Sequence, residues 1–350
     1  MKLVTPRFAA ALGCLALLTG LAPARAQTVA EIEAERTFEI KVDATILEPP
    51  ALTAVSISRD AQLVATGGDD HRVRLWNPVD GTLIRELRGH TDWVRVVQFS
   101  PTSDVLASSG DDRAVMVWDV KSPETPRTLS RPEHPIYTLT WMPTGNMLVA
   151  GGFDDQLRLY DAQTGALVRE LACPSADVHA VAISPAGDLL VAGGRNGMLR
   201  MWRTSDFQVL RDIPAHRQRV RAIVFAPTGN QFASGGDDRQ LRLWNAASGE
   251  SVADLPARSG KIQALAYCGA GQLVSGGSDN SIRLWDIAGK TEVLRLVGHT
   301  GSVSALDFHE ASGTLASGSF DTSARLWKPL ENAKLKVARQ PAEGAPFSQQ

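Results

Sequence analysis

Three stretches of the chain carry a histidine, a serine, an aspartate and a tryptophan at one common spacing. In each stretch the His, Ser and Asp precede the Trp by 28, 10 and 6 residues. The sets are His90, Ser108, Asp112 and Trp118; His216, Ser234, Asp238 and Trp244; and His299, Ser317, Asp321 and Trp327. A Ser–His–Asp constellation can perform nucleophilic catalysis, but it needs one exposed serine beside its base and an oxyanion hole. Because the set recurs three times, the sequence predicts a structural role and no catalytic residue.

Pairs of aspartates raise the question of a metal site. They occur at Asp69-Asp70, Asp111-Asp112 and Asp237-Asp238, each in a short turn. Calcium needs six or more oxygen ligands that converge on one point, which an isolated pair does not supply. The chain also has no Cys-x-x-Cys-His haem motif and no two histidines at metal-ligand spacing. We therefore predict no metal and no cofactor.

The elements that carry these residues repeat along the chain. Seven units close on an aromatic and a polar residue, and the steps between the aromatic residues are 42, 42, 42, 42, 41 and 42. The closing pairs are Trp76-Asn77, Trp118-Asp119, Tyr160-Asp161, Trp202-Arg203, Trp244-Asn245, Trp285-Asp286 and Trp327-Lys328. Within the fifth unit, residues 220–225, 231–236, 240–244 and 250–255 alternate in polarity and are separated by Gly, Pro and Asp turns. Four strands at so regular a period indicate a repeat architecture.

The unit resembles the WD-repeat (G-beta-like) family of seven-bladed β-propellers over residues 37–328. Gly-His occurs at Gly89-His90 and Gly298-His299, and Trp-Asp occurs at Trp118-Asp119 and Trp285-Asp286. The resemblance implies an all-β fold with seven four-stranded antiparallel blades. It also implies that the three His–Ser–Asp–Trp sets are structural tetrads, in which buried polar groups satisfy one another.

Four units depart from the tetrad. The first has Glu48 at the histidine position, the fourth has Pro174 there, and the sixth has no histidine. The serine position holds Ala150 in the third unit and Ala192 in the fourth. We expect blades three and four to depend more on apolar packing and to be the softest part of the ring.

A propeller must also close its ring, and the last unit ends at its third strand. Shifting the fourth strand of the first complete blade back by one period places it within residues 37–46, which alternate in polarity. We therefore expect Thr37–Ile46 to complete the seventh blade. Residues 27–36 are expected to be a lead-in, with a short helical turn over Ala30–Arg36. Residues 329–350 are polar and are expected to form a flexible tail.

The first 26 residues resemble a secretory signal peptide. Lys2 and Arg7 precede an apolar run over residues 8–22, and Ala24-Arg25-Ala26 fits a small-x-small cleavage site. The sequence thus predicts a periplasmic or secreted bacterial protein, cleaved after Ala26 and not inserted in the membrane.

Charge and cysteine content limit the other functions. A formal net charge of −2 over 350 residues gives no basic surface for nucleic acid. Cys173 and Cys268 lie in units three apart, so we expect two lone thiols.

Function is expected on one face of the ring, where the chain enters each first strand and turns between the second and third strands. Exposed aromatic residues flanked by arginine are typical of interface hot spots. The candidate binding residues on this face are Trp93, Phe153, Arg195, Arg219, Lys261 and Phe320. The sequence therefore predicts a non-catalytic, monomeric scaffold for a protein or peptide partner. The alternative is a propeller hydrolase or lyase with its site at the mouth of the central channel.

Overall fold

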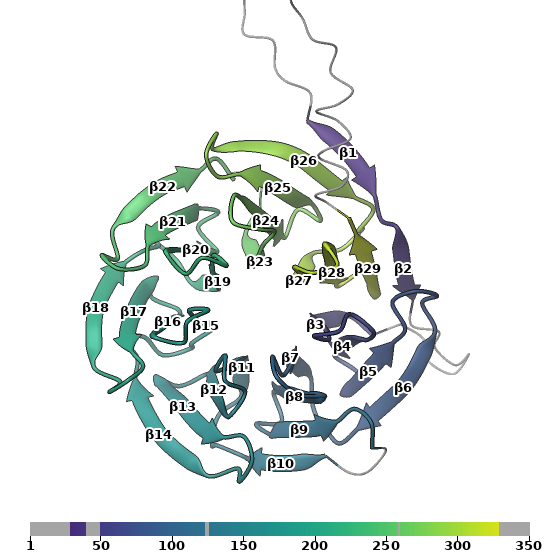
Figure 1. The fold of residues 1–350 in the computed structure, drawn as a ribbon, viewed down its shortest axis with the longest axis horizontal. Helices are drawn as coiled ribbons and strands as arrows, with labels where there is room; N and C mark the ends of the chain where they lie inside the picture. The colour runs from purple at the N-terminus through teal and green to yellow at the C-terminus, as the bar shows by residue number, and fades with distance from the viewer. Residues whose placement is uncertain (1–28, 40–49, 123–125, 258–259, 329–350) are drawn as a thin grey trace, which may run out of the picture.

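Seven four-stranded units are arranged radially around a central axis (Figure 1). The computed structural model describes residues 29–39, 50–122, 126–257 and 260–328, and every regular element in these ranges is a β-strand. The four strands of each blade are antiparallel, with the first nearest the axis and the fourth toward the rim. The predicted all-β, seven-bladed propeller is confirmed.

The strands of each blade follow the chain from the channel to the rim. Blade 1 contains β3 (Leu52–Ile57), β4 (Val64–Gly68), β5 (Arg72–Trp76) and β6 (Leu83–Arg88), and blade 2 contains β7 (Val94–Phe99), β8 (Val105–Gly110), β9 (Val115–Asp119) and β10 (Arg127–Ser130). Blade 3 contains β11 (Ile136–Trp141), β12 (Met147–Gly152), β13 (Gln156–Asp161) and β14 (Leu167–Ala172), and blade 4 contains β15 (Ala180–Ile183), β16 (Leu189–Gly193), β17 (Met198–Arg203) and β18 (Val209–Pro214). Blade 5 contains β19 (Val220–Phe225), β20 (Gln231–Gly236), β21 (Leu241–Asn245) and β22 (Ser251–Leu255), and blade 6 contains β23 (Ile262–Tyr267), β24 (Gln272–Gly277), β25 (Ile282–Asp286) and β26 (Thr291–Val297). Blade 7 contains β27 (Val303–His309), β28 (Thr314–Ser319) and β29 (Ser323–Trp327).

An N-terminal strand completes blade 7. Strand β2 (Arg36–Glu39) pairs antiparallel with β29, with Phe38 opposite Ala324. The Phe38 side chain is 1% exposed, and its ring stacks on Trp76 of blade 1 at 5.8 Å between ring centroids. The strand begins one residue before the predicted segment, and residues 40–46 of that segment lie outside the described residues. The two strands that pair at the closure, β2 and β29, therefore come from opposite ends of the chain.

A further strand precedes β2 and extends blade 6. Strand β1 (Ala30–Glu33) pairs parallel with β26, so blade 6 has five strands. The expected helical turn over Ala30–Arg36 is wrong. Ala30 is buried and Ile32 is partly buried, whereas Glu31 and Glu33 are exposed, and this period of two suits a strand at the rim. The signal peptide and the C-terminal tail fall on residues 1–28 and 329–350, outside the described residues, so the predicted domain boundaries stay predictions.

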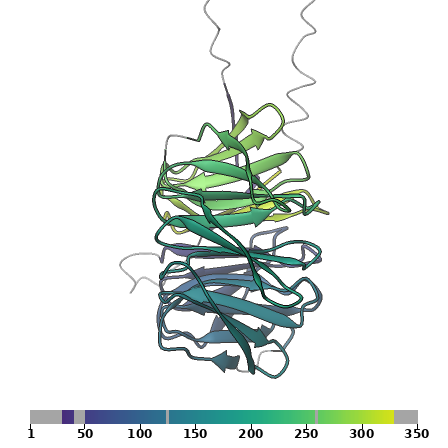
Figure 2. The ribbon, with the colours of Figure 1, turned by 90° about the vertical axis from the view of Figure 1, so that its left-hand side faces the viewer.

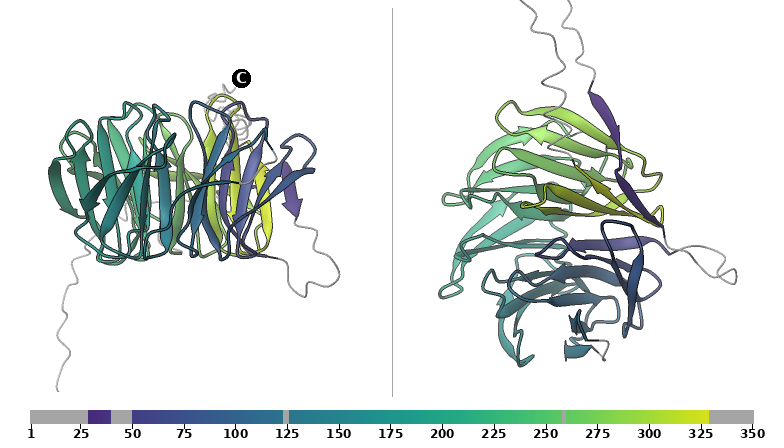
Figure 3. Two further views of the ribbon diagram at one scale, coloured as in Figure 1. Left: turned by 90° about the horizontal axis from the view of Figure 1, so that it is seen from below. Right: turned by 45° about the vertical axis from the view of Figure 1, so that its right-hand side comes forward.

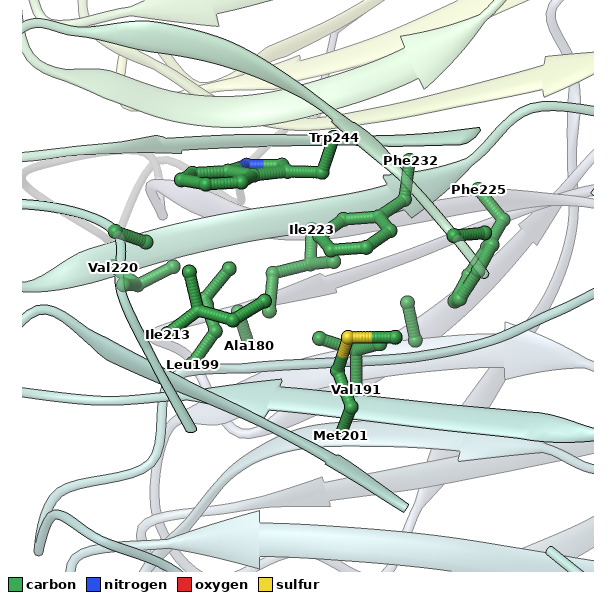
Figure 4. Packing of buried hydrophobic residues seen from close by; sticks show 13 residues of the cluster. Ala180, Val191, Leu199, Met201, Ile213, Val220, Ile223, Phe225, Phe232 and Trp244 are labelled. Carbon is green, nitrogen blue, oxygen red and sulfur yellow. The ribbon is translucent and has the colours of Figure 1, made fainter. Parts of the chain in front are cut away.

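Apolar side chains fill the space between neighbouring blades. Between blades 4 and 5 the cluster includes Phe225, Phe232 and Trp244 from blade 5 and Leu199 and Met201 from blade 4 (Figure 4). Phe232 is 0% exposed and stacks on Trp244 with 6.2 Å between ring centroids. Full burial of one large apolar side chain stabilises a fold by roughly 1.5–3 kcal/mol. Each blade packs in this way against two neighbours, so an apolar cluster lies at each of the seven junctions between blades.

Polar side chains on the first strands also join neighbouring blades. The Asp307 carboxylate of blade 7 accepts a hydrogen bond from the backbone N–H of Ile57 in blade 1, at 2.7 Å. Ser56 accepts from Phe99 N–H of blade 2 at 3.1 Å, and the Gln98 amide oxygen accepts from Trp141 N–H of blade 3 at 3.2 Å. These bonds connect the innermost strands across three successive junctions, including the closure.

The strands run between the two faces of the disc (Figures 2 and 3). We call one of these faces the turn face. It is formed by the turns between second and third strands and by the loops that lead into first strands. The turns between third and fourth strands lie on the opposite face, because neighbouring strands are antiparallel. Within the described residues, no helix has the length and apolar character needed to cross a membrane.

Candidate functional site

The His–Ser–Asp–Trp set of blade 5 forms a continuous hydrogen-bonded chain. His216 Nδ1 lies 2.9 Å from Asp238 Oδ1, and His216 Nε2 lies 2.7 Å from Ser234 Oγ. Trp244 Nε1–H donates to Ser234 Oγ at 2.8 Å. One proton arrangement satisfies every group: the indole donates to the serine oxygen, the serine hydroxyl donates to Nε2, and Nδ1–H donates to the carboxylate.

Blades 2 and 7 repeat this geometry. His90 Nδ1 lies 2.9 Å from Asp112 and His299 Nδ1 lies 2.8 Å from Asp321, and both Nε2 atoms lie 2.7 Å from the serine hydroxyl of their blade. The serines Ser108, Ser234 and Ser317 are 0% exposed. A substrate cannot reach a hydroxyl that is fully buried, so this geometry supports a structural role.

The tetrad carboxylates are held in their charged form. Burial alone raises the pKa of Asp238, but hydrogen bonds from His216 and from the backbone N–H groups of Arg217 and Gln240 outweigh it and lower that pKa. The pKa values of Asp112 and Asp321 are lowered for the same reasons. The turns that these aspartates close are therefore tied to the blade interior by a charge-assisted contact.

Four blades lack the tetrad, and in three of them an arginine binds the turn aspartate; the fourth, blade 4, has Asn196 at that position. Asp154 Oδ2 lies 2.5 Å from the Arg158 guanidinium in blade 3, and Asp279 Oδ2 lies 2.6 Å from that of Arg283 in blade 6. The guanidinium of Arg74 contacts Asp70 in the same way in blade 1. An ion pair that the sequence analysis did not predict therefore replaces the tetrad at the turn of blade 3, and the expectation that blades 3 and 4 depend more on apolar packing stays a prediction. The signal was an arginine four residues after the aspartate.

Backbone contacts set the positions of the candidate binding residues. The N–H of the residue before each turn aspartate donates to the carbonyl of the residue at the entrance of the first strand. The distances are 2.9 Å for Asp111 to Trp93, 3.0 Å for Phe153 to Pro135 and 2.9 Å for Asp237 to Arg219. In these three blades a glycine ends the second strand, because a Cβ at Gly110, for example, would lie 1.9 Å from the Trp93 carbonyl oxygen. Each blade thus presents one entrance residue and one turn residue side by side.

These positions leave three large aromatic side chains open to solvent. Trp93 is 40% exposed, Phe153 is 52% exposed and Phe320 is 46% exposed. Arg195 and Lys261 are also exposed, and Arg219 is partly buried. The structure places all six candidate binding residues on the turn face.

The sequence analysis did not predict a ring of seven side chains that lies around the channel mouth. Each member lies two positions after the entrance residue of its blade, as Arg95 does after Trp93. We call this set the channel ring, and its members are Thr53, Arg95, Tyr137, His179, Arg221, Gln263 and Ser304. In six blades the first strand has a register shift at this residue, as between Val94 and Val96 around Arg95. A β-bulge bends the strand and re-aims the extra residue, here toward the axis. The 42-residue spacing that identified the blades could have identified this ring.

Aromatic contacts connect the channel ring to the exposed face over blades 2 and 3. The Tyr137 ring stacks on His179 with 4.5 Å between centroids and an interplanar angle of 5°, and it meets Phe153 edge-on at 6.5 Å. The Arg95 guanidinium lies 4.6 Å from the centroid of the Trp93 ring and 5.9 Å from that of Tyr137. This arrangement is a preformed aromatic cluster whose outer members are solvent-exposed.

A hydrogen bond and two ion pairs continue the network across blades 4 and 5. His179 Nε2 lies 2.9 Å from Asp177 Oδ1, and the other Asp177 oxygen contacts the Arg219 guanidinium. The Arg221 guanidinium lies 3.0 Å from Asp237 Oδ1. Burial and the positive charges of the two arginines lower the pKa of His179 to about 4, against the effect of Asp177. His179 is therefore neutral at neutral pH.

The channel ring surrounds a cavity that opens on the turn face. Its volume is ≈ 470 Å³, and its wall also includes Phe153, Asp177, Arg219, Lys261 and Phe320. Two hydroxyls on this wall donate to backbone carbonyls: Thr53 Oγ1 to Gly67 O at 3.1 Å and Ser304 Oγ to Leu52 O at 2.6 Å. Neither hydroxyl is hydrogen-bonded to a base, so neither is activated as a nucleophile in the manner of a Ser–His pair.

The described part of the chain contains no cluster of side chains that could coordinate a metal ion. No group of three or more His, Cys, Asp or Glu side chains there is arranged to hold a metal ion. Cys173 and Cys268 are both buried and free, which confirms the prediction of two lone thiols.

Short stretches of the chain are similar to three fungal proteins named "Nuclear distribution protein PAC1". The relative from Mycosarcoma maydis is 42% identical over 55 residues, covering 16% of this chain and 12% of the relative. The relative from Coprinopsis cinerea is 33% identical over 72 residues (21% and 17%), and that from Cryptococcus neoformans var. neoformans serotype D is 34% identical over 56 residues (16% and 13%). The matches thus span less than a fifth of the length of these relatives.

These relatives correct the predicted location. The sequence predicts a bacterial periplasmic or secreted protein, whereas the matched proteins are fungal nuclear distribution proteins. That prediction depended on residues 1–26, which lie outside the described residues, so the described fold gives it no support. The comparisons contradict the predicted location, and we do not retain it.

A family comparison accounts for the whole ring. The model described as "WD domain, G-beta repeat" matches seven times, at residues 45–77, 81–119, 124–161, 165–203, 207–245, 249–286 and 290–328. Each match contains the first three strands of one blade, and the tetrads of blades 2, 5 and 7 lie within their matches. The chain therefore belongs to the WD domain, G-beta repeat family.

Proposed function

We propose that this chain is a non-catalytic platform that binds a segment of a protein partner on its turn face. Propellers of this family are generally scaffolds that bind protein partners. The observation that carries the proposal is the exposure of Trp93, Phe153 and Phe320 around the cavity at the channel mouth.

The energetics of exposed aromatic side chains support this site. An exposed apolar patch favours association, and large aromatic side chains dominate binding energy where a partner desolvates them. The cluster is held in place before binding, because Arg95 packs on Trp93 and Tyr137 packs on both His179 and Phe153. A preformed site loses less side-chain entropy when a partner binds.

The cavity also suits a segment rather than a small substrate. It is open toward the turn face, and its wall combines aromatic rings with charged groups that already have partners within the chain. A side chain of the partner can enter the mouth while neighbouring residues lie across the exposed rings.

The test compares two double variants of the full chain in crosslinked affinity capture from cells that express it. Trp93→Ala/Phe153→Ala should lose the captured partner. The control, Val79→Ala/Val252→Ala, removes exposed apolar groups that lie off the turn face, 69% and 52% exposed, and should retain it. All proteins should melt at similar temperatures. Equal capture by both double variants would contradict the proposal.

A further inference from the structure

The turn face carries an asymmetric distribution of charge. Over blades 4 and 5 it presents the exposed side chains of Arg195, Arg217 and Arg239, and Lys261 follows at the entry to blade 6. In the ranges that the structure describes, none of these three arginines makes an ion pair. Positive charge therefore remains on this part of the face, which we call the cationic sector.

The carboxylates of the cationic sector do not neutralise it. Asp177 binds His179 and Arg219, and Asp237 binds Arg221. Lys261 Nζ lies 4.0 Å from the same Asp237 oxygen that Arg221 already contacts. Two cations thus share one carboxylate.

Arg219 adds an unused donor on the cavity wall. One of its terminal nitrogens contacts Asp177, but its Nε is buried without a hydrogen-bond partner among the described residues. A buried donor without a partner is unfavourable unless another group accepts its hydrogen bond.

The opposite half of the face does not suit a basic partner, although it carries exposed acids at Asp92, Glu133 and Asp155. A lysine or arginine would need an open aromatic face for a cation–π contact. Arg95 already lies over the rings of Trp93 and Tyr137, and His179 is stacked on Tyr137. Phe153 and Phe320 remain as surfaces for an apolar side chain.

Resting on the proposed function, we infer that the partner segment is an acidic peptide with an apolar anchor. The anchor contacts Phe153 and Phe320 at the channel mouth, and carboxylates on one side of it face Arg195, Arg217 and Lys261. Complementary charge determines which partners are rejected and how fast the right one associates. The interaction should therefore weaken as the salt concentration rises.

The experiment selects binders from a random linear peptide library displayed on phage, using the full-length chain as bait. Enriched peptides should be rich in Asp and Glu around an apolar residue. Their affinity should fall about tenfold or more for Arg195→Glu/Arg217→Glu, which places like charges opposite the peptide. The matched control, Arg59→Glu/Lys290→Glu, reverses two exposed cations on the opposite face and should bind like the parent. Asp92→Lys should not weaken binding.

The outcomes separate this inference from the proposed function. Neutral or basic peptides that lose binding with Phe153→Ala would overturn the acidic class and leave the platform in place. Acidic peptides that bind equally well after both charge reversals would overturn the cationic sector as their site. If no enriched peptide responds to Phe153→Ala or to the arginine reversals, both the platform and the acidic class are wrong.

Discussion

His216→Ala removes the centre of one tetrad and leaves the turn face intact. Asp238, 5% exposed at its side chain, then keeps only the N–H groups of Arg217 and Gln240, each at 3.1 Å, and loses the imidazole donor. Ser234 loses the acceptor of its hydroxyl proton. The change also leaves a cavity, because the imidazole has no exposed surface.

The magnitude follows from these losses. A hydrogen bond to a charged group contributes about 1.5–3 kcal/mol, and a stranded buried hydroxyl destabilises by about 1 kcal/mol or more. We expect the free energy of unfolding to fall by roughly 2–4 kcal/mol, which lowers the melting temperature by several degrees in a domain of this size.

The assay is thermal unfolding followed by circular dichroism at neutral pH. The control is His134→Ala, which removes the same side chain at an exposed position of blade 3 and should leave the melting temperature nearly unchanged. A His216→Ala variant that melts with the parent would refute the structural role. Partner binding lost at an unchanged melting temperature would instead indicate a functional one.

Four further outcomes are expected. Phe38→Ala should destabilise the ring by roughly 3–5 kcal/mol in chemical denaturation, because it empties the contact with Trp76 at the closure, and a loss below about 1 kcal/mol would contradict closure by β2. Burial raises the pKa of Asp307 above its ordinary 3.8, so the folded chain binds that proton more tightly than the unfolded chain and wild type loses stability as pH rises through the folded pKa. The Asp307→Asn variant should therefore have a higher melting temperature than wild type at neutral pH, and the two melting temperatures should converge in acid. A constant difference in melting temperature at every pH would contradict this prediction. Burial raises the pKa of Cys173 to about 12 and also raises that of Cys268, so iodoacetamide at pH near 8 should label neither thiol until the chain is denatured, as read by mass spectrometry. Trp93→Ala should reduce the fraction of tryptophan fluorescence quenched by acrylamide and shift the melting temperature little, whereas an unchanged quenchable fraction would show a shielded indole.

The repeat explains why the fold could be predicted from the sequence. Each blade must place apolar side chains on both faces at one register, so Trp244 and its equivalents recur at nearly constant spacing. Closure by an N-terminal strand followed from the repeat, although the observed strand, Arg36–Glu39, begins one residue before the expected segment and places Phe38 opposite Ala324. Strand β1 could not be inferred, because its four residues bury only Ala30 and it pairs outside the repeat.

The candidate site was harder to predict because its residues vary from blade to blade. Exposed residues such as Phe153 stand out as departures from a polar turn. Arg95, Tyr137 and His179 do not, because an alternating strand would assign them to the flank of a blade. In blades 2 and 3 a β-bulge turns Arg95 and Tyr137 toward the axis, and a bulge changes the pairing without a sequence signal of its own.

The two kinds of register position divide the work of the chain between stability and recognition. At the serine and tryptophan positions, a substitution leaves a buried polar group without its hydrogen-bond partner. Ser234, for example, accepts a hydrogen bond from Trp244 and is hydrogen-bonded to His216. In the channel ring, the bulge fixes the direction of the side chain and leaves its chemistry free, so the position holds Thr53 in blade 1, Tyr137 in blade 3 and Gln263 in blade 6. Seven variable side chains can therefore converge on one cavity without altering the sheets that hold them. Substitutions in this ring should consequently change which segment binds while leaving the unfolding transition almost where it was, the reverse of the effect expected in the tetrads.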